Sequence, residues 1–181
     1  MKAKWLTLIA VASLTACVHQ PQTRSPIPIS WQFDEKAAEE QLKDGTGTIS
    51  GSAFMRQQGG GVVTCAGADV LLIPHTKYTN ERMDKLYGAP VYQGNTSAKS
   101  ATDLILYGEP QFDPDPAGYR TLTRRTTCDA QGNFTFDLLK AGNYYLVTRV
   151  LWRVAQSQQG GFLATMASVS EGRATKVIMS R

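Results

Sequence analysis

Short β-rich runs separated by turn signals dominate this chain after its first 45 residues, and they limit the folds open to it. The alternation is strictest in residues 133–138, where Phe134 and Phe136 fall on one face. Glycine clusters such as residues 59–61 supply the positive-φ conformations that chain reversals need. This pattern is typical of an antiparallel β-sandwich, so we expect an all-β fold over residues 45–181.

The expected strands cover residues 48–55, 62–67 leading into 68–74, 133–138, 144–152, 162–169 and 174–179. A chain of 181 residues is long enough for one well-buried domain and too short for two ordinary ones. The formal net charge is +4, and removal of Lys2 and Lys4 with a leader would leave 17 basic against 15 acidic side chains, or +2. This balance does not predict a nucleic-acid partner.

Residues 1–16 have the order of a secretory signal peptide. A basic start is followed by an apolar run, residues 5–13, that is too short to span a bilayer. The sequence Leu14-Thr15-Ala16-Cys17 resembles the lipobox of bacterial lipoproteins. The resemblance implies cleavage before Cys17 and its modification by diacylglycerol and a palmitate-type acyl chain, which together anchor a protein stably.

The alternative is an ordinary signal peptide in which Cys17 is incidental. In the lipoprotein family, Asp directly after the cysteine favours retention in the inner membrane, and this chain has Val18 there. The resemblance therefore implies an outer-membrane location, facing the periplasm or the cell surface.

Residues 17–44 are expected to form a lipidated tether and one short helix. The proline-containing stretch 18–30 predicts a polar, partly extended tether rather than a packed element. Residues 35–43 are rich in helix formers, with Asp34 as the N-cap and Gly45 as the stop.

Four segments, in this order, resemble the carboxypeptidase regulatory-like domain, a transthyretin-like (prealbumin-like) sandwich of about seven strands. They are Gly51-Ser52-Ala53-Phe54, Ala66-Gly67-Ala68-Asp69-Val70, Thr127-Cys128-Asp129-Ala130-Gln131-Gly132-Asn133-Phe134 and Ala141-Gly142-Asn143-Tyr144. A minimal member of that family has a short link where this chain has an insertion, residues 74–127. The stretch that begins Leu72-Ile73-Pro74 also resembles a group of bacterial lipoproteins of unassigned role, which implies no activity.

Two cysteines remain once Cys17 is assigned to the lipid. An even remainder in a secreted chain predicts a disulfide between Cys65 and Cys128, and the resemblance places them on antiparallel neighbours. The competing interpretation is a reactive thiol pair, but the CxxC spacing and an adjacent histidine are missing.

The sequence shows no catalytic signature, so we expect neither an enzyme nor a cofactor. Its two histidines, His19 and His75, cannot make a histidine-rich metal site. The carboxylates of Asp113 and Asp115 are too few for calcium, which requires about six to eight oxygens. Hydroxyisourate hydrolases share the sandwich, but this chain lacks their C-terminal Tyr-Arg-Gly-Ser.

The insertion combines tyrosine and arginine, a composition typical of binding surfaces. The predicted docking surface consists of Tyr78, Arg82, Tyr87, Tyr92, Tyr107, Arg120, Arg124 and Arg125. The alternative is that these side chains cover the edge of the sandwich.

Together these features predict a non-catalytic, lipid-anchored envelope protein that acts as a structural or protein-docking module. Its expected partners are the membrane, through the lipid, and an envelope protein. The alternative is a glycan-binding module for peptidoglycan or surface polysaccharide, which exposed aromatic side chains forming a platform would favour. An unrecognised hydrolase would need a cleft with convergent carboxylates.

Overall fold

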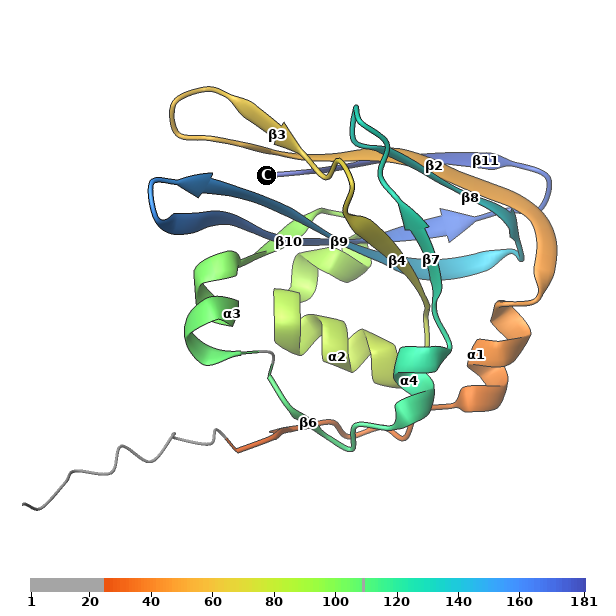
Figure 1. Cartoon of the computed structure of the whole chain (residues 1–181). Helices are drawn as coiled ribbons and strands as arrows, with labels where there is room; N and C mark the ends of the chain where they lie inside the picture. Colours follow the sequence, from red (N-terminus) through yellow and green to blue (C-terminus); the bar gives the residue numbers. More distant parts are fainter. Residues whose placement is uncertain (1–24, 109) are drawn as a thin grey trace, which may run out of the picture.

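The structure is a computed structural model that describes residues 25–108 and 110–181, and its architecture is an all-β sandwich, as the sequence predicted (Figure 1). One sheet has five strands in the order β5-β10-β9-β4-β7, and all its neighbours are antiparallel. These strands are β4 (Asp69–Pro74), β5 (Ser97–Ser100), β7 (Arg124–Thr127), β9 (Gly142–Val154) and β10 (Ser157–Val169).

The second sheet is built around the long strand β2 (Asp44–Arg56). It pairs with β3 (Val62–Thr64), β8 (Asn133–Leu139) and β11 (Ala174–Ser180). The β11 strand runs parallel to β2, in contrast to the purely antiparallel arrangement predicted. The reason is that residues 170–173 carry the chain from one sheet to the other, in a turn with Gly172 at a φ of 64°.

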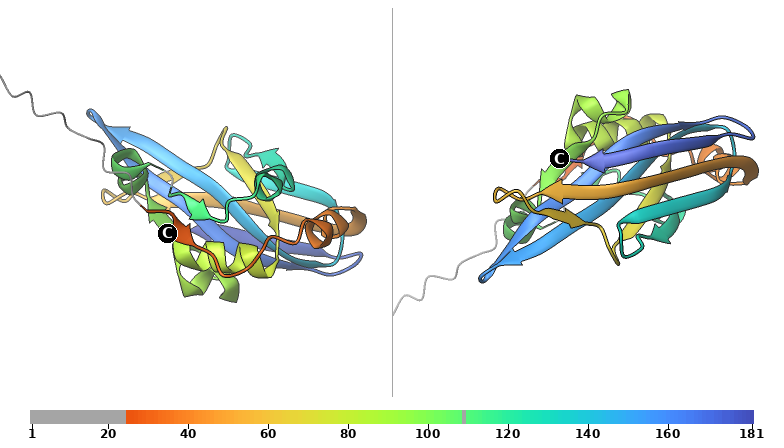
Figure 2. Two further views of the ribbon diagram at one scale, coloured as in Figure 1. Left: turned by 90° about the horizontal axis from the view of Figure 1, so that it is seen from below. Right: turned by 90° about the horizontal axis from the view of Figure 1, so that it is seen from above.

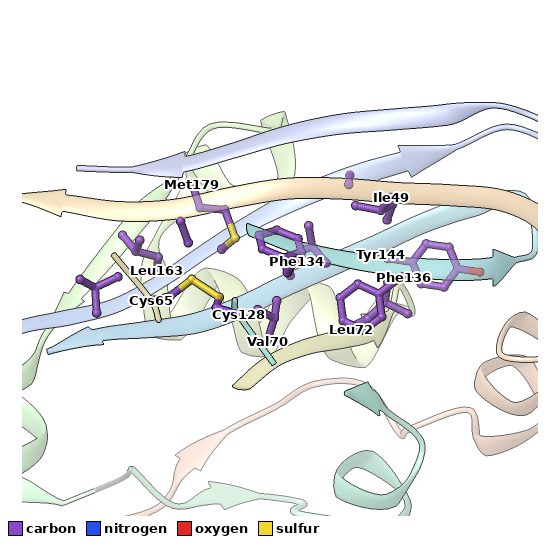
Figure 3. Packing of buried hydrophobic residues seen from close by; sticks show 14 of the residues in the cluster. Ile49, Cys65, Val70, Leu72, Cys128, Phe134, Phe136, Tyr144, Leu163 and Met179 are labelled. Atoms are coloured by element: carbon purple, nitrogen blue, oxygen red, sulfur yellow. A yellow bond between two sulfur atoms is a disulfide. The ribbon is translucent and has the colours of Figure 1, made fainter. Parts of the chain in front are cut away.

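The core between the sheets comes from the inward positions of both. Ile49, Phe134 and Met179 from one sheet meet Val70, Leu72 and Leu163 from the other, and all are buried (Figure 3). The alternation in residues 133–138 therefore predicted which side chains of β8 point into the core. Two of them, Phe134 and Phe136, pack edge to face with ring centroids 6.3 Å apart.

A disulfide joins Cys65 and Cys128, which confirms the predicted pairing. Cys65 lies where the chain crosses from β3 to β4, and Cys128 directly follows β7, the antiparallel neighbour of β4. Both cysteines are buried in the core (Figure 3), and their separation of 63 residues closes the insertion into a loop.

The insertion contains most of the helical structure of the described residues. Its elements are α2 (Lys77–Tyr87), the 3-10 helix η1 (Ala89–Gln93), β5, α3 (Ala101–Tyr107), β6 (Phe112–Asp113), α4 (Ala117–Thr121) and β7. These helices lie over the outer face of the five-stranded sheet, whereas β2, β8 and β11 form the uncovered opposite layer (Figure 2). Within the described residues, no helix has the length and apolar composition that crossing a bilayer would require.

The N-terminal helix α1 (Glu35–Gln41) forms where the sequence predicted it, and the Asp34 carboxylate caps it by accepting from the Ala37 amide at 2.9 Å. The segment before it differs from a free tether. Strand β1 (Ile27–Pro28) pairs in parallel with β6, and Ile29 is buried against the insertion. The polar stretch therefore ends by about residue 26, and Cys17 lies outside the described residues.

Replacing both disulfide cysteines with alanine should lower the free energy of unfolding by about 4 kcal/mol, because the open loop restores conformational entropy to the unfolded chain. Urea denaturation measures the change. Reductant should destabilise the wild-type chain by a similar amount and leave the double variant unaffected. A double variant as stable as the oxidised wild type would contradict this expectation.

Candidate functional site

The structure places two members of the predicted docking surface in the protein interior. Tyr78 is fully buried, and Arg82 is 2% exposed. Tyr78 belongs to a second apolar cluster, between the insertion and the five-stranded sheet, that also contains Ile73 and Tyr145. Arg82 lies against two aromatic rings of this cluster. Tyr78 and Arg82 therefore help to cover the sandwich, which was the alternative to a docking role, and neither side chain is available to a partner.

The Arg82 guanidinium is the centre of this second cluster. Its Nη1 donates to Asp115 Oδ1 at 2.7 Å and to the Tyr78 hydroxyl at 3.0 Å. The guanidinium carbon lies 4.1 Å from the centroid of Phe112 and 4.3 Å from that of Tyr119. A buried charge with one carboxylate partner and two aromatic faces fixes α2, β6 and α4 to one another.

Asp115 connects this buried arginine to an exposed one. Its second carboxylate oxygen accepts from Arg120 at 2.8 Å. Burial alone raises the pKa of the Asp115 carboxyl, but hydrogen bonds from Arg120 and Arg82 outweigh it and hold this pKa below its ordinary value. Each oxygen of the Asp115 carboxylate thus accepts a hydrogen bond from an arginine, Arg82 or Arg120.

The other predicted docking residues are spread over different surfaces. Tyr92 is 40% exposed on η1, and Arg124 donates to the Leu138 carbonyl at 3.0 Å. The side chain of Tyr107 lies outside the described part of the chain. Among the members of the set whose side chains the structure describes, Tyr87 and Arg125 border the three hollows described next, and the other members do not. The described members therefore do not form one patch.

That outer face is hollowed where the insertion leaves it open. A first hollow of about 210 Å³ is lined by Asp69, Leu71, Arg125, Val147, Arg149 and Phe162. A second, of about 310 Å³, includes Thr64, Arg149, Leu151 and Gln158. A third, of about 300 Å³, is lined by Leu86, Tyr87, Lys99, Leu104, Pro110 and Phe162. We call these three hollows together the hollowed face.

Two shared residues connect the hollows into one track. Arg149 borders the first and second, and Phe162 borders the first and third. They are paired across β9 and β10, so both side chains stand on the same side of the sheet. The track therefore crosses the sheet from the residues near the disulfide to the helices α2 and α3.

The first and third hollows combine an apolar floor with a few polar groups, whereas the second is lined mainly by polar surface. Leu71 and Val147 are half-buried on the same side as Phe162. Asp69 accepts from Arg125 Nη1 at 2.8 Å, which places a paired carboxylate and guanidinium at the rim. Apolar floors with a small number of positioned polar groups are typical of small-molecule sites.

The sequence interpretation missed Asp69, Arg149 and Phe162. The available signal was the strand alternation, which puts Arg149 and Phe162 out of phase with the core-facing residues Leu146 and Leu163. Among the described residues, no group of three or more His, Cys, Asp or Glu side chains could hold a metal ion.

No protein-family model matches the chain, and no curated protein matches its sequence. Among solved structures, the chain is similar to a proposed carbohydrate-binding protein, PA1324, from Pseudomonas aeruginosa. The two are 24% identical with a TM-score of 0.65, over 82% of this chain and 97% of the other. This likeness shows a shared fold.

A second solved structure that matches is GBS52, the minor pilin of Streptococcus agalactiae. The identity is 16% and the TM-score is 0.35, over 76% of this chain and 44% of the pilin.

Asp115→Asn should lower the free energy of unfolding by about 2 kcal/mol, because it leaves the buried Arg82 without its charged partner. This expected loss is smaller than the loss for a fully buried ion pair, because the Asp115 side chain is 26% exposed. Asp113→Asn removes an exposed carboxylate two residues away and should cost less than about 0.5 kcal/mol. Equal losses for the two variants in urea denaturation would contradict the role of Arg82.

The same pair predicts a pH dependence. Because the folded-state pKa of Asp115 is below its unfolded value, its contribution is complete above about pH 5 and declines as the pH falls below about 4. The stability difference between wild type and Asp115→Asn, followed by denaturation at several pH values, should shrink in that direction. A difference that grows toward low pH would contradict the assignment.

Proposed function

We propose that this chain is a non-catalytic, lipid-anchored envelope protein whose hollowed face binds a glycan. The observation that carries the proposal is the track of three hollows joined at Arg149 and Phe162. A linked series of shallow hollows fits successive units of a chain polymer better than it fits a single compact ligand.

The chemistry of the hollowed face suits sugar rings. A sugar presents an apolar C–H face and a rim of hydroxyls, and Phe162 with Tyr87 offers half-buried aromatic surface to such a face. Asp69, Arg125 and Gln158 supply planar donors and acceptors for hydroxyls. The carbohydrate-binding description of the fold neighbour supports the same ligand class.

The proposed anchor is the lipid on Cys17, in the outer membrane and facing the periplasm or the cell surface. Ile27, the first residue of β1, follows Cys17 by 27 − 17 = 10 residues. Ten extended residues reach at most about 35 Å, so the lipid would hold the sandwich within that distance of the bilayer. The all-β sandwich also supports the resemblance to the carboxypeptidase regulatory-like domain, which we retain as a proposal.

Protein docking is the second candidate, and the edge of the four-stranded sheet favours it. Strand β11 is the terminal strand of that sheet, and its Ile178 side chain is 67% exposed. An exposed edge strand with an apolar side chain can pair with an extended segment of another protein. This surface lies on the other sheet from the hollowed face, so the two candidates can be tested with separate variants.

Phe162→Ala should weaken binding to purified sacculi or to surface polysaccharide of the host about tenfold, because it removes an aromatic contact worth about 1.5 kcal/mol. Co-sedimentation with the polymer measures the loss. The matched control is Phe54→Ala, which removes a half-buried ring from the outward face of the four-stranded sheet and should leave binding unchanged. Equal binding by wild type and Phe162→Ala would count against the hollowed face.

Cys17→Ala should abolish incorporation of labelled palmitate, because no thiol remains for the lipid. Metabolic labelling of cells measures the effect. The control is the double alanine variant of Cys65 and Cys128, which should still incorporate label. Continued incorporation of label by Cys17→Ala would contradict the lipid anchor.

A further inference from the structure

We infer that the glycan bound by the hollowed face is anionic, with carboxylate or phosphate groups, and that Arg149 is the residue that recognises this charge. The inference rests on the proposed function, because it names the chemical class of the glycan. It follows from the position of Arg149, the charges around it and the geometry of a guanidinium.

Arg149 lies at the centre of the hollowed face. It is exposed in the middle of β9 and stands directly opposite Phe162 of β10. Because it borders two of the three hollows, a chain polymer that runs from one to the other must pass this guanidinium. The aromatic ring at its side would hold a sugar ring next to the charge.

The other charges of the hollowed face have partners. The residues that line the three hollows include three basic side chains, Arg125, Arg149 and Lys99, and one acidic side chain, Asp69, which gives +2. Asp69 is paired with Arg125 at 2.8 Å, and Lys99 lies 3.7 Å from Asp103. Arg149 has no ion pair within residues 25–108 and 110–181, so its charge is the one left for a ligand.

An unpaired guanidinium in this position discriminates between ligands by charge. Its planar array of donors matches both oxygens of a carboxylate or two oxygens of a phosphate. A neutral glycan would form no ion pair with the Arg149 guanidinium. An anionic glycan would replace the water around this guanidinium with a charge-assisted hydrogen-bonded pair. Because the site is open to solvent, salt should weaken the preference.

The test uses the full lipidated chain in detergent and measures affinity for oligogalacturonate and for its carboxyl-reduced, neutral form. Wild type should bind the acidic oligomer about tenfold more tightly at low salt, and the difference should shrink at high salt. A phosphorylated oligomannose, compared with its dephosphorylated form, shows whether carboxylate or phosphate is the preferred anion.

Arg149→Gln should lose the tenfold preference and bind the neutral oligomer as wild type does, and Arg149→Lys should keep part of the preference. The matched control is Arg153→Gln, an exposed arginine on the same strand and the same side that lines none of the three hollows. It should change the preference less than twofold.

The outcomes separate this inference from the proposed function. If wild type binds acidic and neutral forms equally well, or if Arg149→Gln keeps the preference for anions, the inference is wrong and glycan binding stands. If wild type binds none of these oligomers and also fails to bind sacculi and host polysaccharide, the proposed function is overturned and the inference with it.

Discussion

The buried ion pair between Arg82 and Asp115 is the constraint on which the arrangement of the insertion depends. A guanidinium taken out of water requires a charged partner, and Arg82 is 2% exposed. Its partners lie on α2 itself, on β6, on α4 and in the residues between β6 and α4. The pair therefore determines which part of the five-stranded sheet is covered, and the disulfide at the ends of the insertion closes the loop that contains it.

The insertion covers only part of the outer face of the five-stranded sheet. The insertion packs over Ile73 and Tyr145 and leaves Asp69, Arg149 and Phe162 open on the same face. A sheet face that is neither buried nor uniformly polar is an unusual feature of a small domain, and it creates the hollows that we assign to a glycan. The other sheet ends in strand β11, where the Ile178 side chain is exposed and the Ile178 carbonyl accepts from the Thr96 hydroxyl.

Local patterns predicted the fold well where the determinants are local. The alternation of Phe134 and Phe136, the Asp34 cap and the even cysteine count each led to the observed structure. The burial of Arg82 could not be read in this way, because its partner Asp115 lies 33 residues away and the α2 sequence resembles a solvated helix. Arg149 and Phe162 were missed because they come from separate strands, and only the register of β9 and β10 brings them together.

Ligand binding, as we propose it, occurs on the hollowed face of the five-stranded sheet. Nuclear magnetic resonance of the isotope-labelled chain during titration with fragments of host envelope glycan tests it most directly. We expect the largest amide shifts to cluster at Asp69, Arg149 and Phe162, on β4, β9 and β10. Shifts that cluster on β11 and β2 instead, or no saturable shifts with any envelope glycan, would contradict it.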